Sequence, residues 1–132
     1  MSDILSFTST LLNVGSASRT VLGYRFWSLL QKDAVVTTVD IDPDSKPDII
    51  ADAANLPLDD CTFDLVVCQA CVEHIYDLNQ SIIEIKRVTK KDEFLYFTAP
   101  FLQGFHADPS DYRRFTLNGF VDFVGSECVL ME

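Results

Sequence analysis

With 132 residues, 48% of them hydrophobic, and ten phenylalanines, the sequence predicts a single folded domain over residues 1–132 and excludes a disordered chain. Its formal net charge of −10 argues against a nucleic-acid partner bound through a basic face. No apolar run approaches the ~20 residues of a membrane span, and the N-terminus lacks the basic region of a signal peptide. Four cysteines without an export signal are typical of reduced thiols, so we expect a cytoplasmic protein that does not contact membranes.

The first elements alternate between strand and helix. Residues 9–14 form a short apolar run that ends at the turn of Gly15, which predicts a buried strand. Ser18 can cap a helix, and apolar pairs recur at helical spacing over residues 21–30. The β-branched run at residues 34–41 predicts the second strand.

Three more strands are expected further along the chain, at residues 48–51, 63–68 and 93–99. Between the last two, four apolar residues at helical spacing predict a helix capped by either Asp77 or Asn79. This alternation predicts an α/β fold: a doubly wound, mainly parallel sheet with helices on both faces. Right-handed crossovers place the first strand at the centre of the sheet, where the strand order reverses and ligands bind at the carboxyl ends.

Four segments resemble the class I methyltransferases that use S-adenosylmethionine, and most closely the type 11 group: LLNVGSAS, TVDIDP, ADAANLPLDDCTFDLVVCQACVEHI and IIEIKRV. The resemblance covers residues 10–125, and the segment around the fourth strand is its most specific part. It implies a Rossmann-like fold, S-adenosylmethionine as cofactor, and methyl transfer to a small-molecule substrate.

The resemblance also implies which residues contact the cofactor at the ends of the first two strands. Gly15 lets the backbone turn sharply and approach the ligand, and Ser16 and Ala17 keep that turn small. Asp40 matches the acid that binds both ribose hydroxyls. Asp42, two residues further on, is the alternative for that role.

The remaining predicted cofactor contacts follow the third and fourth strands. Asp52 matches the carboxylate that accepts a hydrogen bond from the adenine amino group, and the backbone N–H of Ala53 is expected to meet the ring. Gln69 matches the wall beside the methionine moiety. Asn13 and Ile41 complete the predicted cofactor set.

Some positions depart from the family pattern. Asn13 stands where an acid is usual, Ala17 stands where a second glycine is usual, and the turn before the fifth strand lacks Pro-Gly-Gly. These departures motivate an alternative function, a catalytically silent binding or scaffold module that keeps the fold. A dinucleotide-binding oxidoreductase is a weaker alternative, because the three-glycine fingerprint is absent.

The acceptor side is expected to involve two histidines and one loop. A hydroxyl acceptor needs a base, and His74 and His106 follow the fourth and fifth strands, so we predict catalytic roles for them. The segment FHADPSDYRRFT resembles a loop of methyltransferases from sugar or secondary-metabolite pathways. Asp111, Tyr112 and Arg114 are therefore predicted to hold a polar substrate, with transfer to oxygen expected before nitrogen; the alternative is a capped helix start with an Asp–Arg pair.

Two further features of the sequence concern metal binding and assembly. Cys68-x-x-Cys71-x-x-His74 is similar to half of a zinc site, but only the distant Cys61 or Cys128 remains to complete four ligands, so no metal site is predicted. The chain also ends within the expected sixth strand, so the last strands of the family's sheet are expected to be missing or incomplete. We expect either a homodimer that covers the exposed edge or a monomer that is prone to aggregate.

Overall fold

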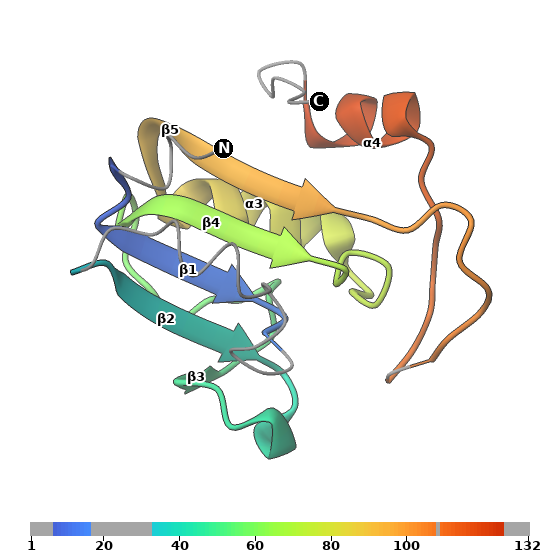
Figure 1. Ribbon diagram of the computed structural model, residues 1–132, viewed down its shortest axis with the longest axis horizontal. Helices are drawn as coiled ribbons and strands as arrows, with labels where there is room; N and C mark the ends of the chain where they lie inside the picture. The colour runs from blue at the N-terminus through green and yellow to red at the C-terminus, as the bar shows by residue number, and fades with distance from the viewer. Residues whose placement is uncertain (1–6, 17–32, 108, 126–132) are drawn as a thin grey trace.

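The computed structural model describes residues 7–16, 33–107 and 109–125 (Figure 1). Its elements follow one another along the chain as β1 (Thr10–Val14), β2 (Val35–Asp40), the 3₁₀ helix η1 (Pro43–Ser45), β3 (Ile49–Ile50), β4 (Phe63–Gln69), α3 (Leu78–Val88), β5 (Thr89–Thr98) and α4 (Leu117–Val124). The expected helix over residues 21–30 with its cap Ser18, the turn residue Ala17, and the expected last strand with Cys128 lie outside the described residues.

The five strands form one parallel sheet in the order β3-β2-β1-β4-β5. This order confirms the predicted doubly wound α/β fold, with β1 at the centre and the winding direction reversing between β1 and β4. Because all strands are parallel, their carboxyl ends meet at one edge of the sheet (Figure 1). Ligands of open α/β sheets bind at that edge, beside the reversal point.

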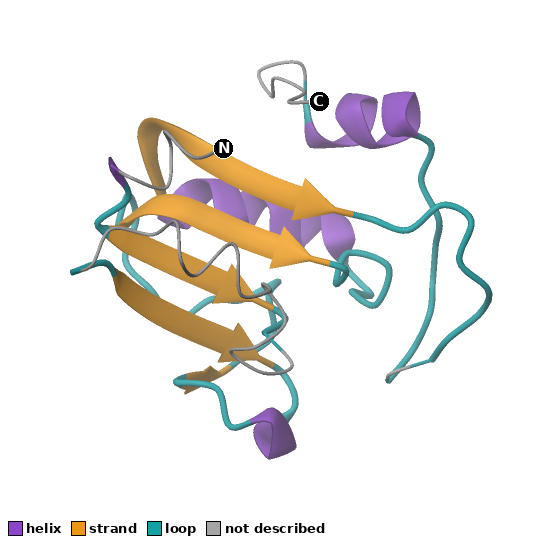
Figure 2. Ribbon diagram, viewed as in Figure 1, coloured by secondary structure: helices purple, strands orange, loops and turns teal. Residues whose placement is uncertain are grey.

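Apolar residues bury both faces of the two central strands. Leu12 and Val66 belong to a core cluster shared with the apolar stripe of α3, which crosses one face of the sheet (Figure 2). Leu11, Leu65 and Val67 form a second cluster, and each of them is at most 1% exposed. A strand that is buried on both faces needs a run of apolar residues. This explains why β1 and β4 appear in the sequence as apolar runs.

The element boundaries agree with the sequence except at the fifth strand. Asp77, not Asn79, caps α3, because its side chain accepts a hydrogen bond from the backbone N–H of Gln80 at 3.1 Å. The fifth strand was expected to begin at residue 93 but begins at Thr89, directly after α3. The sequence does not indicate this earlier start, because residues 90–93 are polar. They form an irregular bulge, with Asp92 at φ +63°. On both sides of this bulge, β5 is paired with β4.

Arg87 fastens the segment before β4 to α3. Its guanidinium donates to the Glu84 carboxylate at 2.8 Å and to Asp60 at 2.6 Å. It also donates to the carbonyl oxygens of Leu58 at 2.7 Å and Leu56 at 3.0 Å. Glu84 in turn accepts from the backbone N–H of Leu56, so the chain between β3 and β4 is held on the helix that supports the sheet.

β3 and β5 are the edge strands of the described sheet. The homodimer expected across an open edge stays a prediction. Within the described part of the chain, no helix has the length and apolar character needed to cross a membrane.

Asp64 joins the start of β1 to β4 and β5. Its Oδ2 accepts from the backbone N–H groups of Ser9 at 2.9 Å and Thr10 at 2.8 Å, and its Oδ1 accepts from Lys90 Nζ at 2.6 Å. Burial raises the pKa of this carboxyl, but the hydrogen bonds from Lys90, Thr10 and Ser9 outweigh burial and hold the pKa at about 2. The charged form is therefore the one that the fold stabilises.

Asp64→Asn is expected to lower the free energy of unfolding at pH 7 by about 2 kcal/mol, since the pKa falls from 3.8 to about 2 on folding. A depressed folded pKa stabilises the fold above the unfolded pKa, and this contribution is lost as the pH falls from about 4 to about 2. Urea denaturation at pH 7 and pH 2.5 measures both quantities. Asp59→Asn, which changes a neighbouring acid of the preceding loop, is the control. If Asp64→Asn lowered the free energy of unfolding by the same amount at pH 7 and at pH 2.5, the stabilising role of the Asp64 charge would be contradicted.

Candidate functional site

A cavity of about 220 Å³ lies at the carboxyl edge of the sheet. Seven of the predicted site residues line it: Gly15, Asp40, Ile41, Asp52, Ala53, His74 and Tyr112. Further lining residues come from the segments after β4 and β5, among them Ala70, Cys71, Ile75, Tyr76, Pro109 and Ser110. The other predicted residues in the described chain lie outside this lining: Asn13, Ser16, Gln69, His106, Asp111 and Arg114.

Gly15 occupies a tightly packed position in the cavity wall. Its φ is +68°, and its N–H donates to the carbonyl oxygen of Val39 at 2.9 Å. A Cβ at this position would lie 2.1 Å from the Sγ of Cys71 and 2.7 Å from its Cβ. Both the backbone conformation and the contact therefore require glycine, and the turn brings bare backbone to the cavity.

Asp40 and Asp42, the two alternatives for the ribose acid, have different surroundings. Asp40 ends β2 at the cavity wall, where its Oδ1 accepts from the backbone N–H of Asp42 at 3.0 Å. The carboxylate of Asp42 caps η1 by accepting from the N–H of Asp44 at 2.9 Å, and Asp42 does not line the cavity. Of the two alternatives, Asp40 is therefore the one that lines the cavity.

Asp52 and Ala53 follow β3 on the same side of the cavity. Asp52 Oδ1 accepts from the backbone N–H of Ala54 at 2.9 Å, a local turn that holds the carboxylate in place. The N–H of Ala51 donates to the carbonyl oxygen of Asp40 at 3.0 Å. The ends of β2 and β3 thus present two carboxylates to one cavity.

Asn13, Ser16 and Gln69 are not among the residues that line the cavity. Asn13 is 2% exposed on the central strand, and its Nδ2 has no hydrogen-bond partner among the described residues. Ser16 is buried with its N–H directed at the Val39 carbonyl oxygen, and Gln69 ends β4 opposite Thr98.

The segments after β4 and β5 are fastened to each other beside the cavity. The N–H of Tyr112 donates to the carbonyl oxygen of Glu73 at 2.9 Å, and His74 Nδ1 lies 2.5 Å from the carbonyl oxygen of Ser110. The Arg113 guanidinium donates to two further carbonyl oxygens of the first segment. The two segments therefore form one wall of the cavity.

Asp111 and Arg114 build the second of these segments. Arg114 forms an ion pair with Asp111 and holds the pKa of that carboxyl well below its usual range, and the backbone N–H of His106 also donates to it at 2.8 Å. Arg114 additionally donates to the carbonyl oxygen of Gly104. Thr116 caps α4 two residues further on. The structure thus shows the Asp–Arg pair and the capped helix start, whereas Tyr112 is the member of the predicted substrate set that reaches the cavity.

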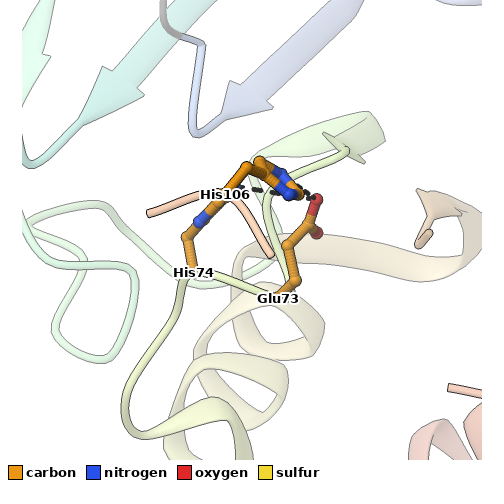
Figure 3. Close-up of side chains that lie close together, drawn as sticks. All are labelled: Glu73, His74 and His106. Carbon is orange, nitrogen blue, oxygen red and sulfur yellow. Dashed lines mark ion pairs between the residues drawn. The ribbon is translucent and has the colours of Figure 1, made fainter. Parts of the chain in front are cut away.

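Three side chains converge next to the cavity (Figure 3): Glu73, His74 and His106. Glu73 Oε1 lies 3.7 Å from His74 Nε2 and 3.8 Å from His106 Nε2, and the imidazole rings meet edge to face with centroids 4.9 Å apart. The Glu73 side chain is 1% exposed. Sequence reasoning singled out both histidines but missed Glu73. The available signal was an acid directly before His74, just past a buried strand.

The cysteines of the CxxCxxH segment do not join this cluster. Hydrogen bonding with Cys71, together with burial, raises the pKa of the Cys68 thiol well above its usual value, so Cys68 stays protonated. Cys61, Cys68 and Cys71 are free thiols. In residues 7–16, 33–107 and 109–125, the one group of converging ligand atoms contains no cysteine.

Comparison with solved structures identifies the fold. A protein of Bacillus halodurans assigned as a methyltransferase is 22% identical, with a TM-score of 0.61 over 73% of this chain and 48% of its own. A Haloferax volcanii protein with the same assignment, solved in complex with the Trm112 methyltransferase activator, is 20% identical with a TM-score of 0.57 over 72% and 48%. An S-adenosylmethionine-dependent methyltransferase of Aquifex aeolicus is 17% identical with a TM-score of 0.59 over 77% and 62%.

At these identities the similarity establishes the fold, and the chain spans about half the length of the first two structures. No curated protein is similar enough in sequence to count as a match. Residues 21–97, more than half of the 132 residues, match the sequence family described as "Methyltransferase domain", the type 11 group. The chain therefore belongs to the type 11 methyltransferase family.

Proposed function

We propose that this chain binds S-adenosylmethionine in the cavity at the carboxyl edge of the sheet and transfers its methyl group to a small-molecule acceptor. One observation carries the proposal: Gly15, Asp40 and Asp52 follow three different strands and line the same cavity. Family membership and the methyltransferase fold of the similar structures support it.

The residues present fit such a cofactor. The turn at Gly15 brings backbone to the cavity where a side chain would collide with Cys71. The carboxylates of Asp40 and Asp52 are acceptors suited to the ribose hydroxyls and the adenine amino group. When bound, S-adenosylmethionine supplies an electrophilic methyl group on a sulfonium. The chain's own part is then to hold and orient both reactants, which is the main source of acceleration for an in-line transfer.

The acceptor side of the proposal rests on the wall made by the segments after β4 and β5. Tyr112 and His74 reach the cavity there, and His106 lies against His74. His74 Nδ1 donates to the Ser110 carbonyl oxygen, which leaves Nε2 able to accept a proton from an acceptor hydroxyl. We propose a polar acceptor of the sugar or secondary-metabolite kind, methylated on oxygen before nitrogen. The net charge of −10 supports a small molecule over a nucleic acid, and a cytoplasmic location is part of the same proposal.

Asp40→Ala is expected to weaken S-adenosylhomocysteine binding at least about 100-fold, since it removes a charged acceptor for two hydroxyl donors worth ~1.5–3 kcal/mol each. Isothermal titration calorimetry measures the affinity. Asp42→Ala is the matched control, because it removes a nearby acid outside the cavity lining, and it is expected to change the affinity less than threefold.

The same titrations separate the proposed function from its alternatives. Binding of S-adenosylmethionine and S-adenosylhomocysteine, but not NAD, supports the methyltransferase. If none of the three ligands bound, the proposed methyltransferase function would be contradicted and the scaffold module would be favoured. Equal loss in the Asp40 and Asp42 variants would contradict the assignment of the ribose acid.

A further inference from the structure

Glu73 is a buried carboxylate whose role the cofactor cavity does not explain. Its side chain is 1% exposed, and neither carboxylate oxygen has a hydrogen-bond partner in the described part of the chain. Burying an ionised group without hydrogen bonds or an ion costs several kcal/mol. The two imidazole nitrogens that face Glu73 stand at 3.7 and 3.8 Å, beyond hydrogen-bond distance. The carboxylate is therefore left without a hydrogen bond among the described residues, although its charge interacts with that of the Arg114 guanidinium.

In both histidines, Nε2 is the nitrogen nearest Glu73, and the other nitrogen, Nδ1, has a polar partner that orients the ring. His74 Nδ1 donates to the carbonyl oxygen of Ser110 at 2.5 Å. His106 Nδ1 lies 3.2 Å from the carbonyl oxygen of Gly104, 3.3 Å from Arg114 Nη2 and 3.6 Å from the Asp111 carboxylate, and the tautomer that donates to Gly104 is the one that can bind a metal through Nε2. An Nδ1–H held by a carbonyl or carboxylate leaves the lone pair on Nε2. In metal sites, a ligating histidine almost always has such an outer partner on its second nitrogen. Both Nε2 atoms here are directed at Glu73 (Figure 3).

The three ligand atoms lie within 4.8 Å of one another. A tetrahedral ion with bonds of about 2.0–2.2 Å to nitrogen and oxygen separates its ligands by roughly 3.4 Å. Two of the three separations, from Glu73 Oε1 to the two Nε2 atoms at 3.7 and 3.8 Å, come within a few tenths of an ångström of that value, and no pair of ligand atoms is more than 4.8 Å apart. We infer that Glu73, His74 and His106 bind a divalent first-row transition-metal ion.

Two imidazoles and one carboxylate favour a transition metal over Mg²⁺ or Ca²⁺, which prefer all-oxygen sites. Three protein ligands also leave at least one coordination position open, as in catalytic sites and unlike closed structural ones. His74 and Ser110 line the cavity, so the open position lies beside the proposed acceptor wall. An acceptor with a metal-binding oxygen, such as a hydroxyl or carboxylate, is the substrate class this arrangement suits. That role rests on the proposed function, whereas the metal site itself does not.

A bound ion would also change what the two histidines do. As ligands, their Nε2 lone pairs point to the metal, so neither nitrogen remains free to act as the proton acceptor. A divalent ion would lower the pKa of a bound hydroxyl, so that this hydroxyl could release its proton to solvent water instead of to a side-chain base.

Titration of the untagged chain with Co²⁺ tests the site directly, since a coordinated Co²⁺ ion absorbs visible light. We expect one saturable site per chain, displaced by Zn²⁺. Glu73→Gln and His106→Gln are each expected to weaken Co²⁺ binding at least about 100-fold, because each removes one of three ligands. Cys61→Ser, which removes an exposed thiol away from the cluster, is the matched control and is expected to bind as the unaltered chain does.

Thermal melting without metal checks that each variant folds. If Glu73→Gln does not fold because Glu73 is buried, His106→Gln still tests the site. Absence of a saturable site, a Co²⁺ affinity in both ligand variants equal to that of the unaltered chain, or loss of binding in Cys61→Ser would overturn the inference. Calorimetry with S-adenosylhomocysteine on the same proteins separates the two proposals. Asp40→Ala is expected to keep Co²⁺ binding, while Glu73→Gln and His106→Gln keep binding of the cofactor product.

Discussion

Replacing Gly15 by valine is expected to abolish S-adenosylhomocysteine binding and to lower the free energy of unfolding by about 3 kcal/mol. Two costs add up at this position. A residue with a side chain at φ +68° pays about 1–2 kcal/mol for the left-handed conformation, and a β-branched one is a true outlier there. The new Cβ would also lie 2.1 Å from Cys71 Sγ, so the segment after β4 must move. That segment is one wall of the cavity, which is why ligand binding is lost together with stability.

Gly104→Val is the matched control for this prediction. A Cβ at Gly104 meets no atom within 4 Å, so the substitution is expected to change stability by less than about 0.5 kcal/mol. Combining Gly15→Ala with Cys71→Gly removes the collision but leaves the backbone strain. This double variant should therefore recover part of the stability lost in Gly15→Ala, and urea denaturation measures the coupling. Equal stability of the Gly15 and Gly104 variants would show that the turn is not tightly packed.

Ile85→Ala is expected to lower the free energy of unfolding by about 3–4 kcal/mol. Ile85 is fully buried in the core cluster between α3 and the sheet, so truncation removes apolar contacts and leaves a cavity. A loss of this size is a large share of the ~5–15 kcal/mol that stabilises a typical domain. It should lower the midpoint of thermal unfolding by about 10 °C or more.

Ile83 provides a control on the same helix with the same side chain. It is 58% exposed, so Ile83→Ala is expected to change stability by no more than about 0.5 kcal/mol. Circular dichroism during urea denaturation gives both values. Similar losses in the two variants would show that the buried face of α3 is not the one that includes Ile85.

The sequence predicts the fold well wherever pattern and burial agree. β1 and β4 are apolar on both faces, and the alternation of strands with helices leads to a parallel sheet with β1 at its centre. The start of β5 could not be predicted, because residues 90–93 are polar and the bulge that accommodates them depends on pairing with β4. The pattern of apolar and polar residues within a segment does not indicate its hydrogen bonds to a strand some 25 residues away.

The site was predictable only in part, for a related reason. Asp40, which ends β2, and Asp52, two residues after β3, reach the cavity because topology alone brings strand ends together. Contacts between two loops depend on how each loop folds, so neither the packing of Cys71 on Gly15 nor the turn of Glu73 toward both histidines could be predicted. Asp111 and Arg114 show the converse case, since their charges are used to hold their own segment.

The central position of β1 also has a consequence for the order in which the protein is made. β1 is synthesised first among the described strands, yet Leu11 pairs with Val36 on one side and with Leu65, 54 residues later, on the other. At about 5–20 residues per second, a ribosome needs some 3–10 s to produce that second neighbour. During this interval the nascent strand carries apolar side chains and unpaired backbone groups on the β4 side. Its folding during translation therefore has to wait for the FDLVVCQ segment to emerge.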